Sequence, residues 1–153
     1  MPKKLDDESD QHLEDCVFCR IAKGTQPASV VYDDDEVIAF LDIQPVNPGH
    51  TLIIPKKHAA YLSELDGETG GRMFKVAMRI GAALRRSGIK CDGVNLHLAD
   101  GEAAFQDIFH VHLHVIPRFK GDGFGLRFGP HYGLRPDRKE LDETTAKIRQ
   151  ALG

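Results

Sequence analysis

The segment Ile-Phe-His-Val-His-Leu-His-Val-Ile-Pro-Arg, residues 108–118, alternates histidines with apolar residues. Its three histidines are His110, His112 and His114. Strict alternation is the period of a half-buried strand, so we predict that the imidazoles project from one face while the apolar residues pack into a core. Three such side chains span about 13 Å, the scale of a metal centre beside a phosphate site. Each neutral ring needs a hydrogen-bond donor and an acceptor, and the cluster therefore indicates chemistry in preference to a solvated, histidine-rich strand face.

The rest of the chain predicts an α+β fold, with an antiparallel meander sheet of about five strands, one long helix and a C-terminal helix. β-prone runs separated by turn residues predict strands at 30–32, 36–41, 51–55 and 93–98, besides 108–118. Apolar residues at helical spacing predict a long helix over 67–87. Shorter helical segments are predicted at 16–23, at 61–65 and from Pro136 to about Leu152.

Composition and charge are those of a globular protein of 153 residues, enough for a single domain, which we place at 16–153. Residues 1–15 carry six carboxylates and two lysines, and they are predicted to form an acidic, flexible tail. A formal net charge of −3 argues against a nucleic-acid partner. The sequence has no apolar run of about 18 residues and no signal-peptide core, so no membrane partner is expected and the predicted location is cytoplasmic.

Several sequence blocks resemble the histidine triad (HIT) family. His-Val-His-Leu-His-Val at 110–115 matches the family signature of alternating histidines and apolar residues. The blocks at 40–45 (Phe-Leu-Asp-Ile-Gln-Pro) and 48–58 (Pro-Gly-His-Thr-Leu-Ile-Ile-Pro-Lys-Lys-His) resemble its upstream motifs, and Cys-Val-Phe-Cys at 16–19 resembles the opening of its zinc-containing bacterial members. The resemblance implies a HIT-like fold and a homodimer. It also implies hydrolysis or nucleotidyl transfer at the α-phosphate of purine nucleotide conjugates, among them phosphoramidates, adenylates and dinucleoside polyphosphates.

The resemblance assigns residue roles as well. His112 would be the nucleophile, through a covalent nucleotidyl-histidine intermediate, with His114 and His50 supporting the phosphate. Asp42 would bind the ribose hydroxyls. The other implied nucleotide-binding residues are Phe18, Ile21 and Phe40 around the base and Gln106 near the phosphate. From the residues alone, Asp42 could instead cap a turn, His50 could be a surface loop histidine, and the apolar residues could be plain core.

Cys16-x-x-Cys19 is a spacing that suits either metal binding or redox chemistry. The odd count of three cysteines argues against a disulfide framework. The resemblance to zinc-containing members implies that His58 and His110 complete a four-ligand zinc site with these cysteines. Such a site has no open position, so the zinc would be structural. A redox pair is the alternative, although the strand–CxxC–helix context in a parallel sheet is missing.

The chain departs from the family pattern just before the histidine segment. Ala99 stands where an amide side chain is usual, Phe105 where glycine is usual, and Asp107 where a hydroxyl is usual. A carboxylate facing a phosphate is repulsive, so Asp107 is expected to turn away or to pair with a cation. Arg118 and Lys120 are candidates to attract a polyphosphate leaving group, or they are solvated surface cations. These departures keep a second interpretation open, a nucleotide-binding protein with little or no catalysis.

Overall fold

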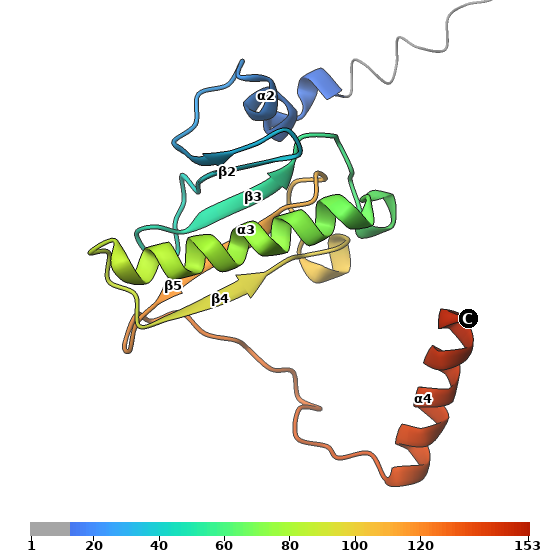
Figure 1. Cartoon of the computed structure of the whole chain (residues 1–153). Coiled ribbons are helices and arrows are strands. Elements are labelled where there is room, and N and C mark those ends of the chain that lie inside the picture. The colour runs from blue at the N-terminus through green and yellow to red at the C-terminus, as the bar shows by residue number, and fades with distance from the viewer. Residues whose placement is uncertain (1–12) are drawn as a thin grey trace, which may run out of the picture. The chain divides into compact units, whose positions relative to one another are not determined.

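Five strands form one antiparallel sheet in the order β1-β2-β3-β5-β4 (Figure 1). The strands are β1 (Val30–Asp33), β2 (Val37–Leu41), β3 (Thr51–Pro55), β4 (Gly93–His97) and β5 (Leu113–Arg118). Every neighbouring pair is antiparallel, and β5 enters the sheet between β3 and β4. The predicted α+β architecture with about five strands is confirmed, and each strand predicted upstream of the histidine segment starts and ends within one residue of its predicted bounds.

The computed structural model describes residues 13–153. Most of the predicted acidic tail, residues 1–12, lies outside the described residues. The chain divides into one compact unit that ends at Asp122 and a second that comprises Gly123–Gly153. A single domain over 16–153 stays a prediction.

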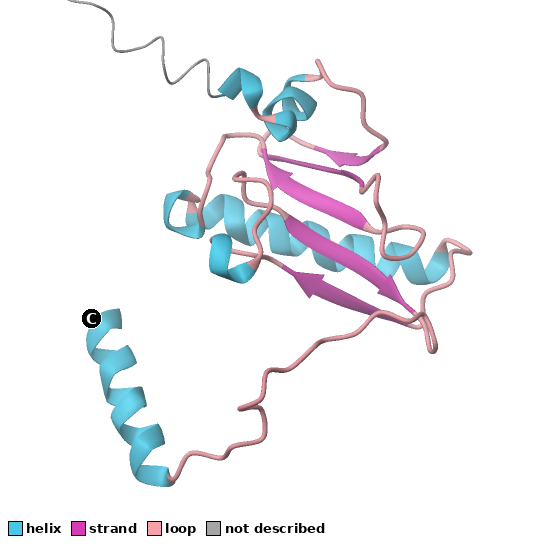
Figure 2. Ribbon diagram, turned by 180° about the vertical axis from the view of Figure 1, so that it is seen from behind, coloured by secondary structure: helices cyan, strands magenta, loops and turns pink. Residues whose placement is uncertain are grey.

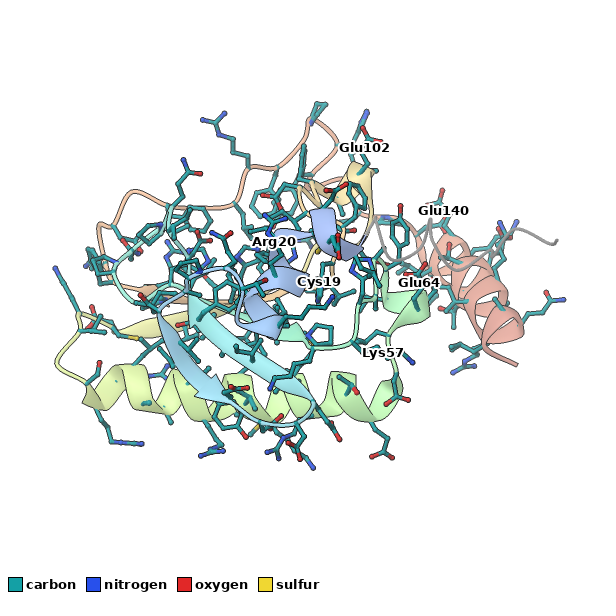
Figure 3. The ribbon with its side chains drawn as sticks, turned by 90° about the horizontal axis from the view of Figure 1, so that it is seen from above. Cys19, Arg20, Lys57, Glu64, Glu102 and Glu140 are labelled. Atoms are coloured by element: carbon teal, nitrogen blue, oxygen red, sulfur yellow. The ribbon has the colours of Figure 1, made fainter. Side chains whose placement is uncertain are left out.

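Strand β2 shows how alternation sorts side chains between the two faces of the sheet. Val37 and Ala39 belong to the core under the long helix α3 (Gly67–Arg86), together with residues of β3, β5 and α3 itself. Ile38 and Phe40 point to the opposite face, where α2 (Val17–Lys23) packs. Figures 2 and 3 show α3 along one side of the sheet and α2, which carries Cys19 and Arg20, on the other. The second face therefore has only a short helical cover, and that leaves room for a pocket.

Helix α3 begins after a capping aspartate and packs against the sheet through a stripe of apolar residues. The side chain of Asp66 caps it by accepting from the backbone N–H of Thr69 at 3.1 Å. Its buried residues are Met73, Val76, Ala77, Gly81 and Leu84. Burying a side chain such as Met73, which is 2% exposed, contributes roughly 1.5–3 kcal/mol. Truncation of Met73 to alanine would open a cavity between helix and sheet.

The histidine segment is extended but only its second half is strand, which corrects the prediction of a strand over 108–118. Strand β5 begins at Leu113, which pairs with Ile53 of β3. Continuing the ladder would set Val111 opposite Pro55, and proline has no N–H to donate. The N–H of Val111 donates instead to the carbonyl of Ala59 at 2.8 Å. The alternation of side chains persists through this break, because Val111, Leu113 and Val115 all lie in the core under α3.

The second unit contains helix α4 (Arg138–Leu152), which matches the predicted terminal helix. Asp137 and Glu140 form a capping box at its start, where each side chain accepts from the other's backbone N–H. All residues of α4 are exposed. Among residues 13–153, none of the helices is long and apolar enough to cross a membrane.

Candidate active site and metal centre

Cys16, Cys19, His58 and His110 converge on one point between α2 and the histidine segment. Their ligand atoms all lie within 4.8 Å of one another. The Sγ of Cys16 lies 3.4 Å from Nδ1 of His110, and the Sγ of Cys19 lies 3.3 Å from Nδ1 of His58. The two Nδ1 atoms are 3.2 Å apart. The sequence separated these residues by up to 94 positions, and the fold brings all four of the predicted ligands together.

These distances fit a tetrahedral zinc ion. With Zn–N bonds of about 2.0–2.1 Å and Zn–S bonds of about 2.3 Å, a tetrahedron has N···N edges of about 3.3 Å and S···N edges of about 3.5 Å. The Nε2 of His110 donates to the carbonyl of Pro55 at 2.8 Å, which leaves its Nδ1 lone pair aimed at the cluster. Burial, with the Cys16 thiol beside it, raises the pKa of the Cys19 thiol to about 12. The Cys19 thiol therefore needs a cation to hold it as a thiolate, and the donor set of the cluster is one that zinc prefers.

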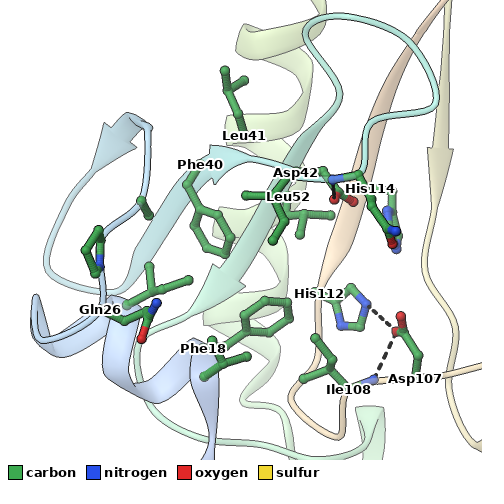
Figure 4. Close-up of a pocket in the computed structure, with 16 residues that line it drawn as sticks. Phe18, Gln26, Phe40, Leu41, Asp42, Leu52, Asp107, Ile108, His112 and His114 are labelled. Carbon is green, nitrogen blue, oxygen red and sulfur yellow. Dashed lines mark hydrogen bonds and ion pairs between the residues drawn. The ribbon is translucent and has the colours of Figure 1, made fainter.

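An open pocket of about 330 Å³ lies beside this cluster, on the face of the sheet that α2 covers (Figure 4). One end is apolar, with Phe18, Ile21 and Phe40 among its walls; the other end holds Asp42, His112 and His114. Phe18 and Phe40 meet edge to face, with ring centroids 5.5 Å apart. The apolar residues also form the core cluster of this face. They thus serve as core and as pocket wall together, and the volume is that of a small-molecule site.

His112 is held by its main-chain neighbour. Its Nδ1 lies 2.8 Å from the carbonyl oxygen of His110, and because a carbonyl only accepts, Nδ1 carries the proton. Nε2 of the neutral ring is then unprotonated. Phe18 packs edge-on against the imidazole, with centroids 5.2 Å apart, and the residue is 3% exposed. The structure presents an oriented imidazole whose Nε2 belongs to the pocket end of the ring, and the neutral form with its lone pair on Nε2 is the form of histidine that acts as a nucleophile.

Val46, His50 and His114 form a hydrogen-bonded chain at the same end, and Asp42 lies beside it. The N–H of Val46 donates to Nδ1 of His50 at 3.1 Å, so the neutral His50 carries its proton on Nε2. That N–H donates to Nδ1 of His114 at 2.8 Å, which in turn places the His114 proton on its own Nε2. Asp42 Oδ2 lies 3.6 Å from Nε2 of His50. Burial lowers the pKa of His114 to about 4, with the neighbouring His112 adding to the effect, so His114 is a neutral donor at pH 7.

The proton positions on His50 and His114 also bear on a second group of residues that could bind a metal ion. Asp42, His50 and His114 each offer a ligand atom within 4.8 Å of the others. A metal needs an unprotonated nitrogen, and the N–H of Val46 already occupies the lone pair of His50 Nδ1. His50 is therefore better described as a positioning residue for His114. Burial lowers its pKa below the usual range, while Asp42 opposes the shift.

Gly49 explains how His50 reaches this position. Its φ of +94° is in the region that favours glycine, and a Cβ there would meet Leu84 of α3 at 2.9 Å. The Pro-Gly-His block thus bends the chain tightly against α3 and turns His50 inward, where it is 3% exposed. The interpretation of His50 as a surface loop histidine is wrong.

Gln106 does not lie where the sequence predicted. Its amide donates to the carbonyls of Ala60 at 2.8 Å and Ile108 at 3.1 Å, and its oxygen accepts from the N–H of Gly101 at 2.8 Å. It is buried and is not among the pocket-lining residues. Its polar atoms hold the loop before the histidine segment, and its amide group is already engaged by two carbonyls, which argues against the predicted role as a phosphate donor.

The departures from the family pattern lie in that loop. Phe105 keeps a left-handed backbone, with φ of +63°, and its side chain is 89% exposed. Of the two expected outcomes, Asp107 does not turn away: its Oδ1 lies 3.5 Å from Nε2 of His112, an ion pair when that ring is protonated, and it lines the pocket (Figure 4). Ala99 is buried. Arg118 is held by Asp122, with Nε–Oδ2 at 2.6 Å, and neither it nor Lys120 lines the pocket.

Several pocket residues were not singled out from the sequence. They are Val17, Gln26, Pro27, Ala28, Leu41, Ile43, Gln44, Leu52 and Ile108. Leu52 carried a usable signal, because it pairs directly with Phe40 across β2 and β3 and alternation sends both side chains to the same face. The loop residues carried none.

Comparison with known proteins agrees with this geometry. The HIT domain family matches residues 23–121. A HIT-like protein from Borreliella burgdorferi is 46% identical over 131 residues, which cover 84% of this chain and 94% of that protein. The crystal structure of a HIT family protein from Bacillus anthracis superposes with a TM-score of 0.82 at 37% identity, covering 90% of this chain and 97% of that one.

Three further similar proteins carry informative names. A zinc-bound histidine triad family protein from Mycobacterium smegmatis has a TM-score of 0.71 at 42% identity and covers 91% and 99% of the two chains. A histidine triad nucleotide-binding protein from Candida albicans has a TM-score of 0.78 at 29% identity and covers 90% and 96%. An adenylylsulfatase from Arabidopsis thaliana is 40% identical over 116 residues, 75% of this chain and 58% of that protein. Sequence, fold and histidine segment agree, and the chain belongs to the HIT family.

Proposed function

We propose that the protein is a nucleotide hydrolase or nucleotidyl transferase that acts at the α-phosphate of purine nucleotide conjugates. The observation that carries this proposal is the state of His112. Its Nδ1 is hydrogen-bonded to the His110 carbonyl at 2.8 Å, and its Nε2, which carries the lone pair when the ring is neutral, belongs to the polar end of the pocket. The names of the Candida albicans and Arabidopsis thaliana proteins support nucleotide binding and hydrolysis.

The chemistry has two steps. Nε2 of His112 forms a bond to the α-phosphorus while the bond from phosphorus to the leaving group breaks, and the leaving group departs with the bonding electrons and takes up a proton. Water then adds to phosphorus, the N–P bond breaks and a nucleoside monophosphate is released. The positive charge that the ring gains on attack is stabilised by the His110 carbonyl at Nδ1.

The other polar residues would hold the substrate around this nitrogen. Nε2 of His114 carries a proton and would donate to a phosphate oxygen, with His50 fixing its orientation. Asp42 is 18% exposed in its side chain and lines the pocket, where its carboxylate would accept from the ribose hydroxyls. Its Oδ1 also accepts from the backbone N–H of Gln44 at 2.8 Å, so it caps a turn at the same time.

Phe18, Ile21 and Phe40 would contact the base, because they form the apolar end of the pocket. A flat aromatic base of the AMP or GMP type fits between such walls. We propose a homodimer as the assembled form, and the sedimentation of the purified chain would test it.

We propose a structural zinc ion at Cys16, Cys19, His58 and His110. The support is the edge lengths of the cluster and the zinc-bound protein from Mycobacterium smegmatis. Four protein ligands leave no open position, so the ion would fix the fold of α2 against the histidine segment rather than touch the substrate.

One observation favours a second function, a nucleotide-binding protein with little catalysis. The Asp107 carboxylate faces the nitrogen that would attack phosphorus, where it opposes an incoming phosphate. Trapping the intermediate separates the two functions. The purified protein is mixed with adenosine 5′-phosphoramidate, quenched, and examined by mass spectrometry of the intact chain and of its peptides.

An adenylyl adduct on the peptide that contains His112 is expected, and it is expected to be absent from His112→Ala. The matched control is His131→Gln, which replaces an exposed histidine of the second unit. Tight nucleotide binding without turnover and without adduct would establish the binding protein instead.

A further inference from the structure

The ionised groups of the pocket are unevenly distributed. Among its 16 lining residues there are two carboxylates, Asp42 and Asp107, and no lysine or arginine. Arg118, a basic residue that follows the histidine segment in the sequence, does not line the pocket. Its guanidinium group donates to Asp122 and to Asn95, at 2.6 Å in each case. A site for anionic nucleotides is thus built, in the described part of the chain, without a fixed positive charge.

Asp107 is the more exposed of the two carboxylates, and hydrogen bonding fixes the position of its side chain. Its Oδ1 accepts from the N–H of Ile108 at 2.9 Å, and the same oxygen lies 3.5 Å from Nε2 of His112. Figure 4 shows both interactions converging on that carboxylate. The side chain is 80% exposed, so it stands at the mouth of the polar end rather than deep in the pocket.

The apolar and polar ends of the pocket determine how a bound substrate would be oriented. With the base against Phe18 and Phe40 and the α-phosphorus at His112, the leaving group extends from the polar end toward solvent, past Asp107. A charge that the leaving group carries close to phosphorus would then lie within several ångströms of the carboxylate. At that range and partial exposure, one unit of charge changes a binding or transition-state energy enough to alter a rate by roughly 3- to 10-fold.

We propose that Asp107 selects substrates by the charge of the leaving group, favouring positively charged amines and disfavouring anionic groups. This inference rests on the proposed function. Asp107 opposes the α-phosphate of every substrate alike, and a cationic leaving group offsets that repulsion whereas a carboxylate, sulfate or polyphosphate adds to it. At this position the loop thereby has a carboxylate, which discriminates between leaving groups by charge, in place of a neutral hydroxyl donor. We call this discrimination the charge filter.

Three adenosine 5′-phosphoramidates test this directly, because they differ only in the charge at the far end of the amine. Their amines are 1,3-diaminopropane, which is cationic, butylamine, which is neutral, and 4-aminobutanoate, which is anionic. The quantity is kcat/KM for each substrate with the natural protein and with Asp107→Asn, which keeps the acceptor for the Ile108 N–H. Comparing the two proteins on the same substrate cancels the intrinsic reactivity of the amine.

In Asp107→Asn, the ratio of kcat/KM for the cationic over the anionic substrate, which differ by two units of charge, is expected to fall roughly 10- to 100-fold at low salt. In the natural protein the ratio is expected to shrink as ionic strength rises, because exposed charges are screened. Asp107→Glu is expected to retain most of the discrimination. The matched control is Glu102→Gln, which removes an exposed carboxylate of the same loop that does not line the pocket.

An unchanged ratio in Asp107→Asn, or an equal fall in Glu102→Gln, would overturn the charge filter and leave the proposed function standing. Failure of the natural protein to turn over any of the three compounds would instead overturn the proposed function. Asp107→Ser, which restores a hydroxyl at this position, provides a second variant with the same expected loss of discrimination.

Discussion

Two histidine clusters share one stretch of main chain and differ in what surrounds them. His110 lies in a closed cluster with two cysteines and a second histidine, and it is 0% exposed. His112, two residues later, lies at the end of an open pocket. The two imidazoles differ in which ring nitrogen donates to a backbone carbonyl. His110 donates from Nε2 and has Nδ1 in the cysteine–histidine cluster, whereas His112 donates from Nδ1 and has Nε2 at the pocket end.

The comparison teaches that side-chain type alone does not separate a ligand from a nucleophile. Each imidazole is assigned by the carbonyl it donates to, Pro55 for His110 and His110 itself for His112. The closed cluster excludes substrate and the open one has a hydrogen-bonded histidine pair in place of a metal. Mutations in the two clusters should therefore have effects of different kinds.

The largest effect is expected from His112→Ala. Removing the nucleophile should lower kcat by at least about 10³-fold, while the affinity for a nucleoside monophosphate changes little because the base and ribose contacts remain. Steady-state kinetics and calorimetric binding measure the two quantities. Turnover close to that of the natural protein would show that the open cluster does not act through His112.

Cys19→Ser is expected to act on stability. If the proposed zinc is bound, loss of this buried ligand should release it and lower the free energy of unfolding by several kcal/mol. Cys91→Ser is the matched control, since Cys91 contacts the carbonyl of Gly93 and lies outside the cluster. Metal content by plasma mass spectrometry and denaturant unfolding measure both. A folded, zinc-free variant that binds nucleotide but has lost chemistry would break the division between a structural and a reactive cluster.

The sequence predicted the elements well because their signals are local. β-prone runs between turn residues placed β2 and β3, and apolar residues at helical spacing placed α3, each within about one residue. The start of β5 was missed, because it depends on which residue of β3 lies opposite. Pro55 ends that ladder, and no local signal at Val111 reveals it.

In the candidate site, too, the residues in motifs were predicted and the residues in a loop were not. All four metal ligands are brought together, and so are the three histidines of the pocket end, because motif spacing had already tied them to particular elements. The place of Gln106 was not predicted, and that of Asp107 was left open between two outcomes, because both lie in a loop whose course depends on non-local bonds. Gln106 is pulled inward by the carbonyl of Ala60, 46 residues away, and this leaves Asp107 facing His112.

The open cluster also has a pH signature. The pKa of His114 is lowered to about 4 in the folded protein, against about 6.5 when unfolded, so the unfolded chain binds more protons between these values. The stabilisation by neutral His114 is therefore complete above pH 6.5 and is lost as pH falls toward 4. The stability advantage over His114→Gln should shrink by up to about 3 kcal/mol across that window. Denaturant unfolding at several pH values measures it, with His131→Gln expected to show no such change; a pH-independent difference would contradict a neutral His114.

The smallest effect is expected at Phe105, in the loop that leads to the open cluster. Its φ of +63° is strained for any residue with a Cβ, and its side chain is 89% exposed. Phe105→Gly should therefore be more stable than Phe105→Ala by about 1 kcal/mol, since both lose the aromatic ring and only glycine relieves the strain. Thermal unfolding of the pair decides this, and equal stability would mean that the loop relaxes.

The carbonyl of His110 accepts from the ring of His112, so the backbone of a residue assigned to one cluster orients the side chain of the other. This arrangement makes the number of residues between them invariant. Insertion or deletion of a single residue would turn one histidine toward the core under α3 and bring an apolar side chain into the pocket or the metal cluster. Val111, between them, can change to another apolar residue, but the segment cannot change in length. Descendants of this sequence are therefore expected to vary here by substitution only, and to accumulate insertions and deletions in the loops on either side.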